Sequence, residues 1–302
     1  MFGLYFDDYD TPVFRPPSEA NSFILRVTRG CAHNHCTFCA MYKDVPFTMC
    51  GEAEIAQQIG MAAQYYREHV RRIFLADGDA LVLPTEKLLQ LLNTLYQTFP
   101  KLQRVTSYAS ALDILRKSPE DLAALREAGL KLLYLGLETG DTALLQKIKK
   151  GVTAEESIAA GQKAIAAGMK LSVMVIAGLG GQAGSENHAV LTGRAVSAIA
   201  PHMLSILTLR LYKGTEMLQQ YEKGDFTLLS PAELARETYT FLEHTEIPPE
   251  RHTIFRSNHI SNYINLRGNL PEDKPRLLQE LKAVIPALSQ LTDWEVYTNM
   301  EY

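Results

Sequence analysis

Apolar, β-branched runs alternate with segments of helical period along most of this 302-residue chain. Such alternation is typical of strand–helix units repeated around a parallel sheet. It predicts six strands, at residues 23–28, 72–76, 104–107, 132–137, 170–177 and 204–210. The segments between them have amphipathic spacing, so that Leu88, Leu91, Leu92, Leu95 and Phe99 share one helical face. The chain is therefore predicted to form an α/β barrel or an open α/β sheet.

Helix-start signals fall in register with these repeats. Ser118 is a cap followed by a proline at the first helical position, and Thr153 with Glu156 has the spacing of a capping box. The repeats end near residue 245. We therefore expect a barrel domain over residues 1–245 and a shorter C-terminal extension, residues 246–302, that closes the side of the barrel.

Charge and hydropathy restrict the partners of the chain. Lys and Arg number 30 against 34 Asp and Glu, a formal charge of −4, which disfavours a general nucleic-acid or anionic-membrane binder but leaves room for a local basic patch. The first ten residues lack the positive start of a secretory signal. The longest apolar runs, 130–137 and 171–179, are too short to span a bilayer. The sequence predicts a cytoplasmic protein without a membrane partner.

All four cysteines, Cys31, Cys36, Cys39 and Cys50, lie within twenty residues. In a reducing compartment such clustering indicates metal binding rather than disulfides. The first three follow the first predicted strand, where three thiolates can ligate three irons of a [4Fe–4S] cluster and leave the fourth iron open to a small molecule. Gly30 lets the backbone wrap closely around such a cluster.

Zinc is the alternative metal for this loop. The three loop cysteines, together with His33 and His35, supply enough nitrogen and sulfur ligands for a tetrahedral site. Structural zinc sites usually pair ligands from two knuckles, and no second pair follows here. Cys50 is interpreted either as a packed thiol or as a hydrogen-atom donor near a radical.

The segment from Arg29 to Cys39 resembles the cluster loop of the radical S-adenosylmethionine superfamily. Members carry three cysteines in the pattern C-x3-C-x-φ-C, with φ aromatic, after the first strand of the barrel. Residues 36–39, Cys-Thr-Phe-Cys, match the second half of this pattern, whereas Cys31 and Cys36 enclose four residues rather than three. The resemblance covers about residues 20–215 and implies a partial (β/α)6 barrel with a short C-terminal extension. It also implies a [4Fe–4S] cluster on the three loop cysteines and S-adenosylmethionine bound beside it.

Weaker motifs extend the resemblance after the second and fourth strands. Residues 77–79, Asp-Gly-Asp, stand where relatives carry a glycine-and-carboxylate turn that binds the amino group of S-adenosylmethionine. Gly78 and Asp79 match that turn, and Asp77 replaces its first glycine. The alternative for this segment is a strand-to-helix turn capped by aspartates. Glu138 matches the polar residue that meets the ribose hydroxyls in relatives.

Further along the chain, residues 146–151 resemble the segment of coproporphyrinogen-oxidase-like members in which an Arg pairs with the methionyl carboxylate. Lys150 takes that place here, and the alternative is an exposed helix-end lysine. Gly178 belongs to a segment that corresponds to the fifth-strand motif beside adenine, and the alternative is a glycine-rich loop without a ligand. Phe38 would place its neighbouring backbone against the adenine, or it packs in the core.

The resemblance implies an enzyme. A reduced cluster passes one electron to S-adenosylmethionine, which gives a 5′-deoxyadenosyl radical that abstracts hydrogen from a small organic substrate. Because no second cysteine set exists for an auxiliary cluster, an external one-electron donor such as flavodoxin or ferredoxin is implied. No residue of the chain is assigned as a catalytic acid, base or nucleophile.

Polar residues near the sixth strand and in the extension are candidates for substrate contacts. Arg210 suits a carboxylate or phosphate, and the others are Tyr212, Arg256, Asn258, His259 and Asn262. The alternative is that these side chains cap loops and bond one another. Two other functions remain open, namely a non-catalytic iron–sulfur or zinc protein and an RNA-modifying radical enzyme.

Overall fold

The computed structural model describes residues 13–291. The N-terminal ten residues weighed above, and the last eleven residues of the predicted extension, lie outside the described range. Contacts divide the chain into two units. Unit 1 comprises the described parts of Met1–Asn34, Met41–Leu135 and Lys163–Leu171, and unit 2 those of His35–Ala40, Gly136–Gln162 and Ser172–Tyr302.

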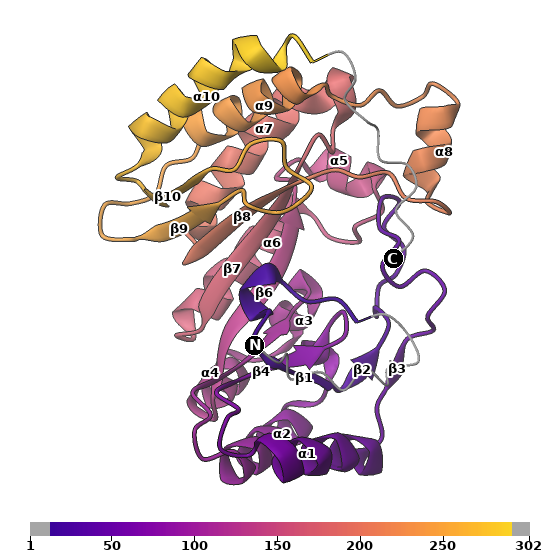
Figure 1. Ribbon diagram of the computed structural model, residues 1–302, viewed down its shortest axis with the longest axis vertical. Coiled ribbons are helices and arrows are strands. Elements are labelled where there is room, and N and C mark those ends of the chain that lie inside the picture. The colour runs from indigo at the N-terminus through magenta and orange to yellow at the C-terminus, as the bar shows by residue number, and fades with distance from the viewer. Residues whose placement is uncertain (1–12, 292–302) are drawn as a thin grey trace. The chain divides into compact units, whose positions relative to one another are not determined.

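Unit 1 is a parallel sheet with helices packed on it. Its strands run in the order β1 (Phe23–Arg26), β4 (Arg72–Ala76), β5 (Arg104–Tyr108) and β6 (Leu130–Glu138), whose last three residues belong to unit 2. The helices are α1 (Glu52–Tyr66), α2 (Thr85–Thr98), α3 (Ala111–Arg116) and α4 (Pro119–Glu127), with short 3-10 turns η1 (Pro17–Glu19) and η2 (Ala80–Val82). An antiparallel pair, β2 (Thr28–Arg29) with β3 (Thr48–Met49), flanks the cysteine loop. Figure 1 shows α1 and α2 side by side along one edge of this unit.

Unit 2 carries a second run of strands, β7 (Lys170–Ala177), β8 (Met203–Thr208), β9 (Thr253–Arg256) and β10 (Arg267–Leu270). The first three are parallel, and β10 pairs with β9 in the antiparallel sense. The helices are α5 (Thr142–Lys147), α6 (Ala154–Ala166), α7 (Gly181–Ile199), α8 (Glu216–Glu222), α9 (Pro231–Glu243) and α10 (Lys274–Leu288). In Figure 1, α7, α9 and α10 stack in a layer against this sheet.

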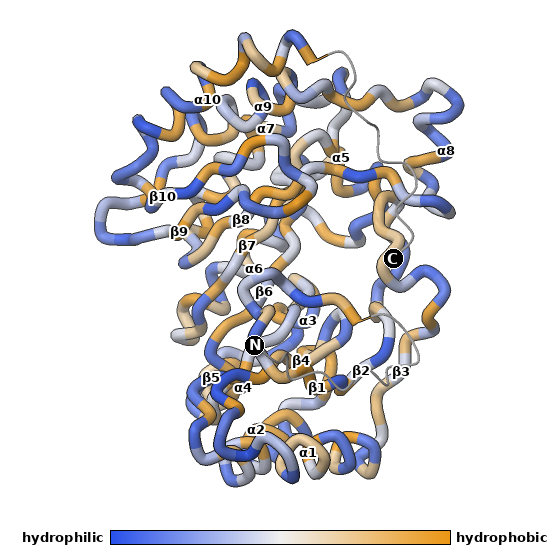
Figure 2. The backbone as a smooth tube through the Cα atoms, in the orientation of Figure 1, coloured by the Kyte–Doolittle hydropathy of each residue, from blue (hydrophilic) through white to orange (hydrophobic). Residues whose placement is uncertain are grey.

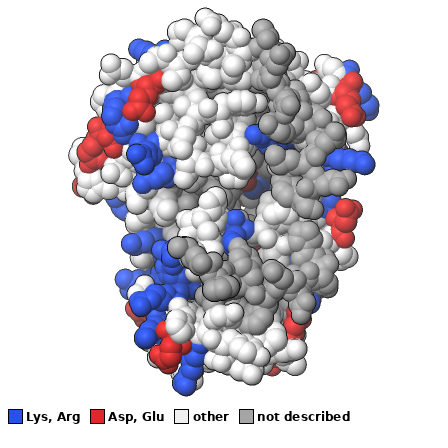
Figure 3. All heavy atoms as spheres, viewed as in Figure 1, with Lys and Arg blue, Asp and Glu red and all other residues white. Residues whose placement is uncertain are grey.

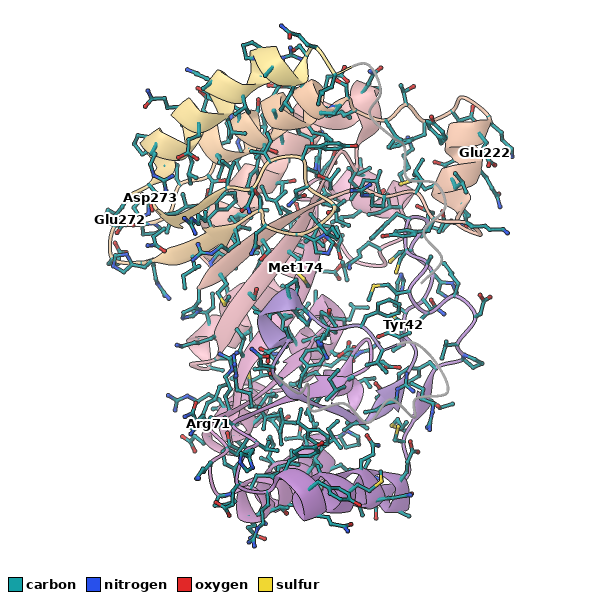
Figure 4. The ribbon with its side chains drawn as sticks, in the orientation of Figure 1. Tyr42, Arg71, Met174, Glu222, Glu272 and Asp273 are labelled. Atoms are coloured by element: carbon teal, nitrogen blue, oxygen red, sulfur yellow. The ribbon has the colours of Figure 1, made fainter. Side chains whose placement is uncertain are left out.

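The two faces of the unit 2 sheet differ in burial. Val173 and Val175 on β7, like Leu204 and Ile206 on β8, are at most 4% exposed. Met174, labelled in Figure 4, alternates with those valines and is only half-buried. Successive side chains of a strand point to opposite faces. One face therefore packs in the core, while the face that carries Met174 is more open; Figure 2 shows hydrophobic colour recurring along these strands.

All six predicted strands are present; those at 72–76 and 170–177 have the predicted boundaries, and the others are shifted by one or two residues. Both predicted caps are confirmed, because Ser118 forms a capping box at α4 and Thr153 exchanges bonds with Glu156 at α6. The sequence did not predict that β9, from the expected extension, would add a further parallel strand beside β8. The division at residue 245 stays a prediction. No helix within residues 13–291 is both long and apolar enough to cross a membrane.

Candidate active site

The cysteine loop follows β1 and β2 and begins beside the end of β4. Cys31, Cys36 and Cys39 are each half-buried, whereas Cys50 is buried. Burial raises the pKa of the Cys50 thiol to about 12, which keeps it protonated and unreactive. Cys50 is therefore a packed thiol in this structure, one of the two interpretations of its sequence context.

Gly30, the residue before Cys31, is held by the turn after β4. Its N–H donates to Oδ2 of Asp77 at 3.0 Å, and its carbonyl accepts from the Gly78 N–H at 3.1 Å. Gly30 has φ +73, and a Cβ there would lie 2.8 Å from the Val45 carbonyl oxygen. Only glycine fits both this conformation and this space.

The turn approaches the first cysteine closely. A Cβ on Gly78 would lie 3.1 Å from both Cα and Cβ of Cys31. The turn predicted to bind the amino group of S-adenosylmethionine thus contacts the first predicted cluster ligand within unit 1. A side chain at position 78 would crowd Cys31.

Asn34 shows how the loop accommodates its longer first spacing. Its φ is +46, a left-handed conformation that asparagine tolerates better than most residues. Its side-chain Nδ2 donates to the Tyr42 carbonyl at 2.7 Å, and its own carbonyl accepts from Lys43 Nζ at 3.2 Å. Within the four-residue spacing, Asn34 is therefore bonded to two residues further along the chain, a feature that the sequence analysis did not foresee.

Asp79 lies behind the turn. Its carboxylate is 3% exposed, and its oxygens accept from the N–H groups of Leu81 and Ser110, each at 3.0 Å. Burial, together with the neighbouring Asp113, raises the pKa of Asp79 well above its ordinary value. This geometry is the capping role offered above as the alternative, and a contact of Asp79 with a ligand stays a prediction.

The second half of the loop is anchored within unit 2. The Thr37 N–H donates to the Ile148 carbonyl, and the Thr37 carbonyl accepts from the Met217 N–H, both at 3.0 Å. Phe38 packs on a buried apolar cluster that includes Leu145 and Leu179. The structure thus gives Phe38 a core-packing role, while its proposed nearness to adenine stays a prediction.

Glu138 and Lys150, both predicted to contact S-adenosylmethionine, form an ion pair. Lys150 Nζ lies 2.7 Å from Oε1 of Glu138, and both side chains are largely buried. Glu138 has φ +61, a conformation rarely adopted by a residue with a side chain. Gly136 leaves room for the Glu138 carboxylate, because a Cβ at position 136 would collide with Oε1 of Glu138. Lys150 is therefore not the freely exposed lysine of the alternative interpretation.

Gly178 is tied to a buried polar network that the sequence analysis missed. Its N–H donates to Oε1 of Glu237 at 2.6 Å, and Ser185 Oγ donates to the other carboxylate oxygen at 2.5 Å. His188 lies beside this carboxylate, with Nε2 3.8 Å from Oε1. Gly178 has φ +83, a conformation that favours glycine. Its N–H is held in place by Glu237, a side chain of α9.

His188 connects this network to the turn after β6. Its Nε2 lies 3.1 Å from the Ile176 carbonyl, which can only accept, so we assign the proton to Nε2. Its Nδ1 then accepts from Thr139 Oγ1 at 2.8 Å. Thr192 Oγ1 accepts from the Gly140 N–H at 2.9 Å. The turns that carry Glu138 and Gly178 are thus braced by one set of buried side chains.

Three of the six predicted substrate residues lie around the end of β8. Arg210 donates to the Ser261 carbonyl at 3.1 Å, and Asn262 bridges the Ile206 and Ser257 carbonyls. His259 Nδ1 bonds Ser261 Oγ at 2.7 Å, and burial lowers the pKa of this imidazole. These bonds connect loops to one another, which is the role that the sequence analysis gave as the alternative to substrate contacts.

The remaining three candidates differ in exposure. Arg256 is half-buried and donates to the Phe255 and Gly268 carbonyls. Tyr212 is half-buried, and Asn258 is exposed. Substrate roles for all six candidates stay predictions.

Comparison with known proteins identifies the class. The chain belongs to the radical SAM superfamily, whose family model matches residues 25–191, more than half of the chain. It is therefore an enzyme that uses a [4Fe–4S] cluster and S-adenosylmethionine. No curated protein sequence matches it.

Solved structures are similar in fold. Methylornithine synthase (PylB) aligns with a TM-score of 0.54 at 17% identity, over 91% of this chain and 75% of that one. Coproporphyrinogen III oxidase (HemN) from Escherichia coli aligns with 0.55 at 18%, over 74% and 52%. Elp3 from Methanocaldococcus infernus gives 0.52 at 12%, over 89% and 64%. These similarities confirm the predicted partial (β/α)6 barrel, while the chain spans only about half of HemN.

The loop residues fit the cluster chemically. Three half-buried thiols follow Gly30, whose backbone packs closely against residues 45–47. Gly78 leaves room beside Cys31. Within residues 13–291, no three His, Cys, Asp or Glu side chains are already grouped closely enough to hold a metal ion. The assignment of Cys31, Cys36 and Cys39 as the ligands is accordingly a proposal.

Proposed function

We propose that this chain holds a [4Fe–4S] cluster on Cys31, Cys36 and Cys39 and acts on a small organic substrate. When bound, the cluster and S-adenosylmethionine would supply the radical chemistry, in which reductive cleavage of S-adenosylmethionine provides a 5′-deoxyadenosyl radical that abstracts hydrogen from the substrate. The observation that carries the proposal is the ordered attachment of both halves of a three-thiol loop, at Gly30 and at Thr37. The protein contributes orientation and the exclusion of water.

The turns after β6 and β7 are proposed to hold S-adenosylmethionine. Glu138 can accept two ribose hydroxyl protons, and Lys150 beside it can meet the methionyl carboxylate, as the matching positions do in relatives. The braced Gly178 turn would offer its backbone to the adenine. Gly78 and Asp79 would place their turn near the amino group, with the Asp79 carboxylate holding that turn from behind.

Electron paramagnetic resonance tests this proposal. The anaerobically reconstituted, dithionite-reduced protein should give a [4Fe–4S] signal that shifts when S-adenosylmethionine is added. Cys31→Ala, Cys36→Ala and Cys39→Ala should each remove the signal, whereas Cys50→Ala should keep it. A protein that binds zinc in place of iron, or a signal insensitive to S-adenosylmethionine, would contradict the proposal and favour the non-catalytic alternative.

The open face of the unit 2 sheet supports a substrate with an anionic group. Strand register aligns Met174 on β7, Ser205 on β8 and Arg256 on β9 in one row. All three are half-buried, so this face combines a guanidinium with a hydroxyl and an apolar side chain. Arginine is the side chain best suited to bind carboxylate or phosphate in a fixed orientation.

Stimulation of S-adenosylmethionine cleavage tests this substrate class. Small carboxylic acids should stimulate formation of 5′-deoxyadenosine more than their amides do, and Arg256→Met should remove the preference. The variant should keep the cluster signal and its shift, which separates the substrate from the cofactors. Equal stimulation by acids and amides would contradict an anionic substrate.

The electron donor and the compartment complete the proposal. A small one-electron carrier such as flavodoxin or ferredoxin would reduce the cluster, because the four cysteines offer ligands for a single cluster. A reducing, cytoplasmic compartment suits cysteine thiols that must bind iron. Reduction of the reconstituted protein by flavodoxin, followed by paramagnetic resonance, tests the donor.

RNA modification is the second candidate, and one observation favours it. Figure 3 shows Lys and Arg side chains gathered at the lower left, over unit 1, where Figure 4 labels Arg71. Arg72 and Arg104 are register partners at the starts of β4 and β5, and Lys101 is exposed nearby in the sequence. Transfer RNA binding that weakens steeply with salt would support this function. Absence of binding at low salt would contradict it.

A further inference from the structure

Asp77 stands where the resemblance to the superfamily implies a glycine, and its side chain has a role of its own in this structure. We propose that Asp77 and Arg26 form a clamp on Gly30 that positions Cys31, which makes both of them positioning residues for the cluster loop. This inference rests on the proposed ligand role of Cys31. It concerns the polypeptide before the cluster binds.

Gly30 is held through both its N–H and its carbonyl. One carboxylate oxygen of Asp77 accepts the Gly30 N–H, and the N–H of the next residue, Gly78, donates to the Gly30 carbonyl. The Asp77 N–H itself bonds both Oγ1 and the carbonyl of Thr28, each at 3.1 Å. The residue before the first cysteine is therefore fixed to the end of β4 without any metal.

Arg26 fixes the orientation of the carboxylate. Its Nε donates at 3.1 Å to Oδ1 of Asp77, the oxygen that Gly30 does not use. Arg26 is 1% exposed and Asp77 is fully buried. Gln58 brackets the Arg26 backbone, with its amide oxygen accepting the Arg26 N–H and its amide nitrogen donating to the Arg26 carbonyl. A buried carboxylate needs both oxygens satisfied, and this arrangement satisfies one with a cation and the other with the loop.

The clamp addresses a specific problem of this loop. A loop that must wrap around a metal cluster has to lose backbone entropy when it binds, and each additional residue increases that loss. The first spacing here contains one residue more than the common pattern. Holding Gly30 in advance lowers the entropy that remains to be lost at Cys31, which is the general benefit of preorganised ligands.

The first experiment removes the clamp while keeping the fold. In the variant Arg26→Met with Asp77→Ala, both buried charges are absent, which avoids the cost of leaving one of them buried without its partner. The Gly30 N–H loses its acceptor. A matched control is Arg104→Met with Glu19→Gln, because that pair is also in unit 1, has a buried carboxylate and a 3.0 Å contact, and does not touch the loop.

We expect the clamp variant to melt near the wild-type temperature and yet bind less iron at equal iron and sulfide supply. Its Cys31 thiol should react with iodoacetamide about fivefold faster, relative to Cys36, before reconstitution. Fivefold corresponds to the loss of one hydrogen bond worth about 1 kcal/mol. The control variant should match wild type in iron content and in the Cys31 to Cys36 ratio.

A folded clamp variant with wild-type iron content and an unchanged reactivity ratio would overturn the proposal. Failure of the clamp is distinguishable from failure of the proposed function. If Cys31→Ala retains the full cluster, Cys31 is not a ligand and the function as proposed fails. If Cys31→Ala loses the cluster and the clamp variant does not, only the clamp fails.

A second measurement uses the unaltered, full-length protein before cluster assembly, so that it does not depend on the variant folding. Hydrogen exchange should show the Gly30 amide protected although it lies in a loop, because its N–H is bonded to a buried carboxylate. The amide of Ala32, an exposed residue two positions later, should exchange faster. Equal exchange at Gly30 and Ala32 would contradict the clamp.

Discussion

Two buried carboxylates, one in each unit, do the same local task by different electrostatic means. Asp77 accepts the N–H of Gly30 and is paired with Arg26. Glu237 accepts the N–H of Gly178, but its other oxygen bonds a neutral hydroxyl, that of Ser185. Each therefore holds a loop glycine at a motif of the site. The comparison teaches that an amide can be anchored by a charged pair or by neutral donors, and the two should respond differently to neutralisation.

The largest expected effect is at Asp77. In Asp77→Asn the side-chain NH2 must face either Arg26 Nε–H or the Gly30 N–H, and the buried guanidinium loses its counter-charge. Breaking one side of a buried pair costs about 3–5 kcal/mol. Urea unfolding of the full chain should show a loss of this order.

The half-exposed pair Arg29–Glu54 is the matched control for that measurement. Its side chains are 30% and 33% exposed at a distance of 2.7 Å. Glu54→Gln should cost less than Asp77→Asn, because solvent partly screens this pair. Equal losses in the two variants would remove the distinction between a buried clamp and an ordinary surface pair.

A second test compares adjacent lysines. Lys150 pairs with Glu138 inside the proposed cofactor site, and Lys149 pairs with exposed Glu216, also at 2.7 Å. Lys150→Met should weaken S-adenosylmethionine binding about tenfold, since a hydrogen bond to a charged group contributes about 1.5–3 kcal/mol. Titration calorimetry of the cluster-loaded protein measures this, with unchanged iron content expected.

Lys149→Met should bind S-adenosylmethionine as wild type does. Lys150→Arg should restore most of the affinity, because a guanidinium can also bind a carboxylate. If the two methionine variants bind alike, the Glu138–Lys150 pair is structural only.

Glu237→Gln should have a smaller effect than Asp77→Asn, and this difference tests the opening comparison directly. A glutamine keeps one acceptor for the Gly178 N–H, and its NH2 can donate to Ser185 Oγ. We expect a stability loss of about 1 kcal/mol. Glu243→Gln, on the exposed face of the same helix, should show none. A loss as large as that of Asp77→Asn would show that neutral donors and a charged partner are not distinguishable here.

Local features of the fold could be predicted from the sequence because their causes are local. Strand and helix periods, the cap at Ser118 and the box at Thr153 depend on residues a few positions apart. Short motifs in the sequence indicated the cysteine loop, Glu138 and Lys150, whose roles stay predictions. The pairing of Glu138 with Lys150 was not predicted, since only the structure shows that Gly136 leaves space for it.

The buried networks could not be predicted, because their members are far apart in the chain. Arg26 and Asp77 are 51 positions apart, and Gly178 and Glu237 are 59 apart. Each nevertheless left a signal. Arg26 is a charge at the end of the apolar run from Phe23, and Glu237 lies at helical spacing between Leu234 and Phe241, on the buried face of α9. A charge in a buried pattern indicates that a partner exists, but it does not say which residue that is.

The last comparison concerns a third buried carboxylate, Asp79, which lies beside a second carboxyl, that of Asp113. Burial and Asp113 raise the pKa of Asp79. Burial by itself raises the pKa of Asp113, but hydrogen bonds with Asp79 and Ser110 outweigh burial and lower this pKa. The proton that the two carboxyls share therefore resides on Asp79. As pH rises above the ordinary range of Asp, the unfolded chain loses this proton while the folded chain keeps it. Stability should therefore fall with rising pH until the folded protein also releases the proton.

Asp79→Asn should remove this part of the pH dependence, because asparagine has no proton to lose. Urea unfolding at about pH 5 and about pH 8 measures it as a smaller stability difference in the variant than in wild type. Asp121→Asn is the control, since a backbone bond from Ser118 lowers the pKa of Asp121. This carboxyl is therefore ionised in the folded and the unfolded chain at both pH values, and the variant should keep the wild-type difference. An unchanged pH dependence in Asp79→Asn would mean that the Asp79 carboxyl is ionised in the fold. It would then join Asp77 and Glu237 as a third buried charge at the turns of the site.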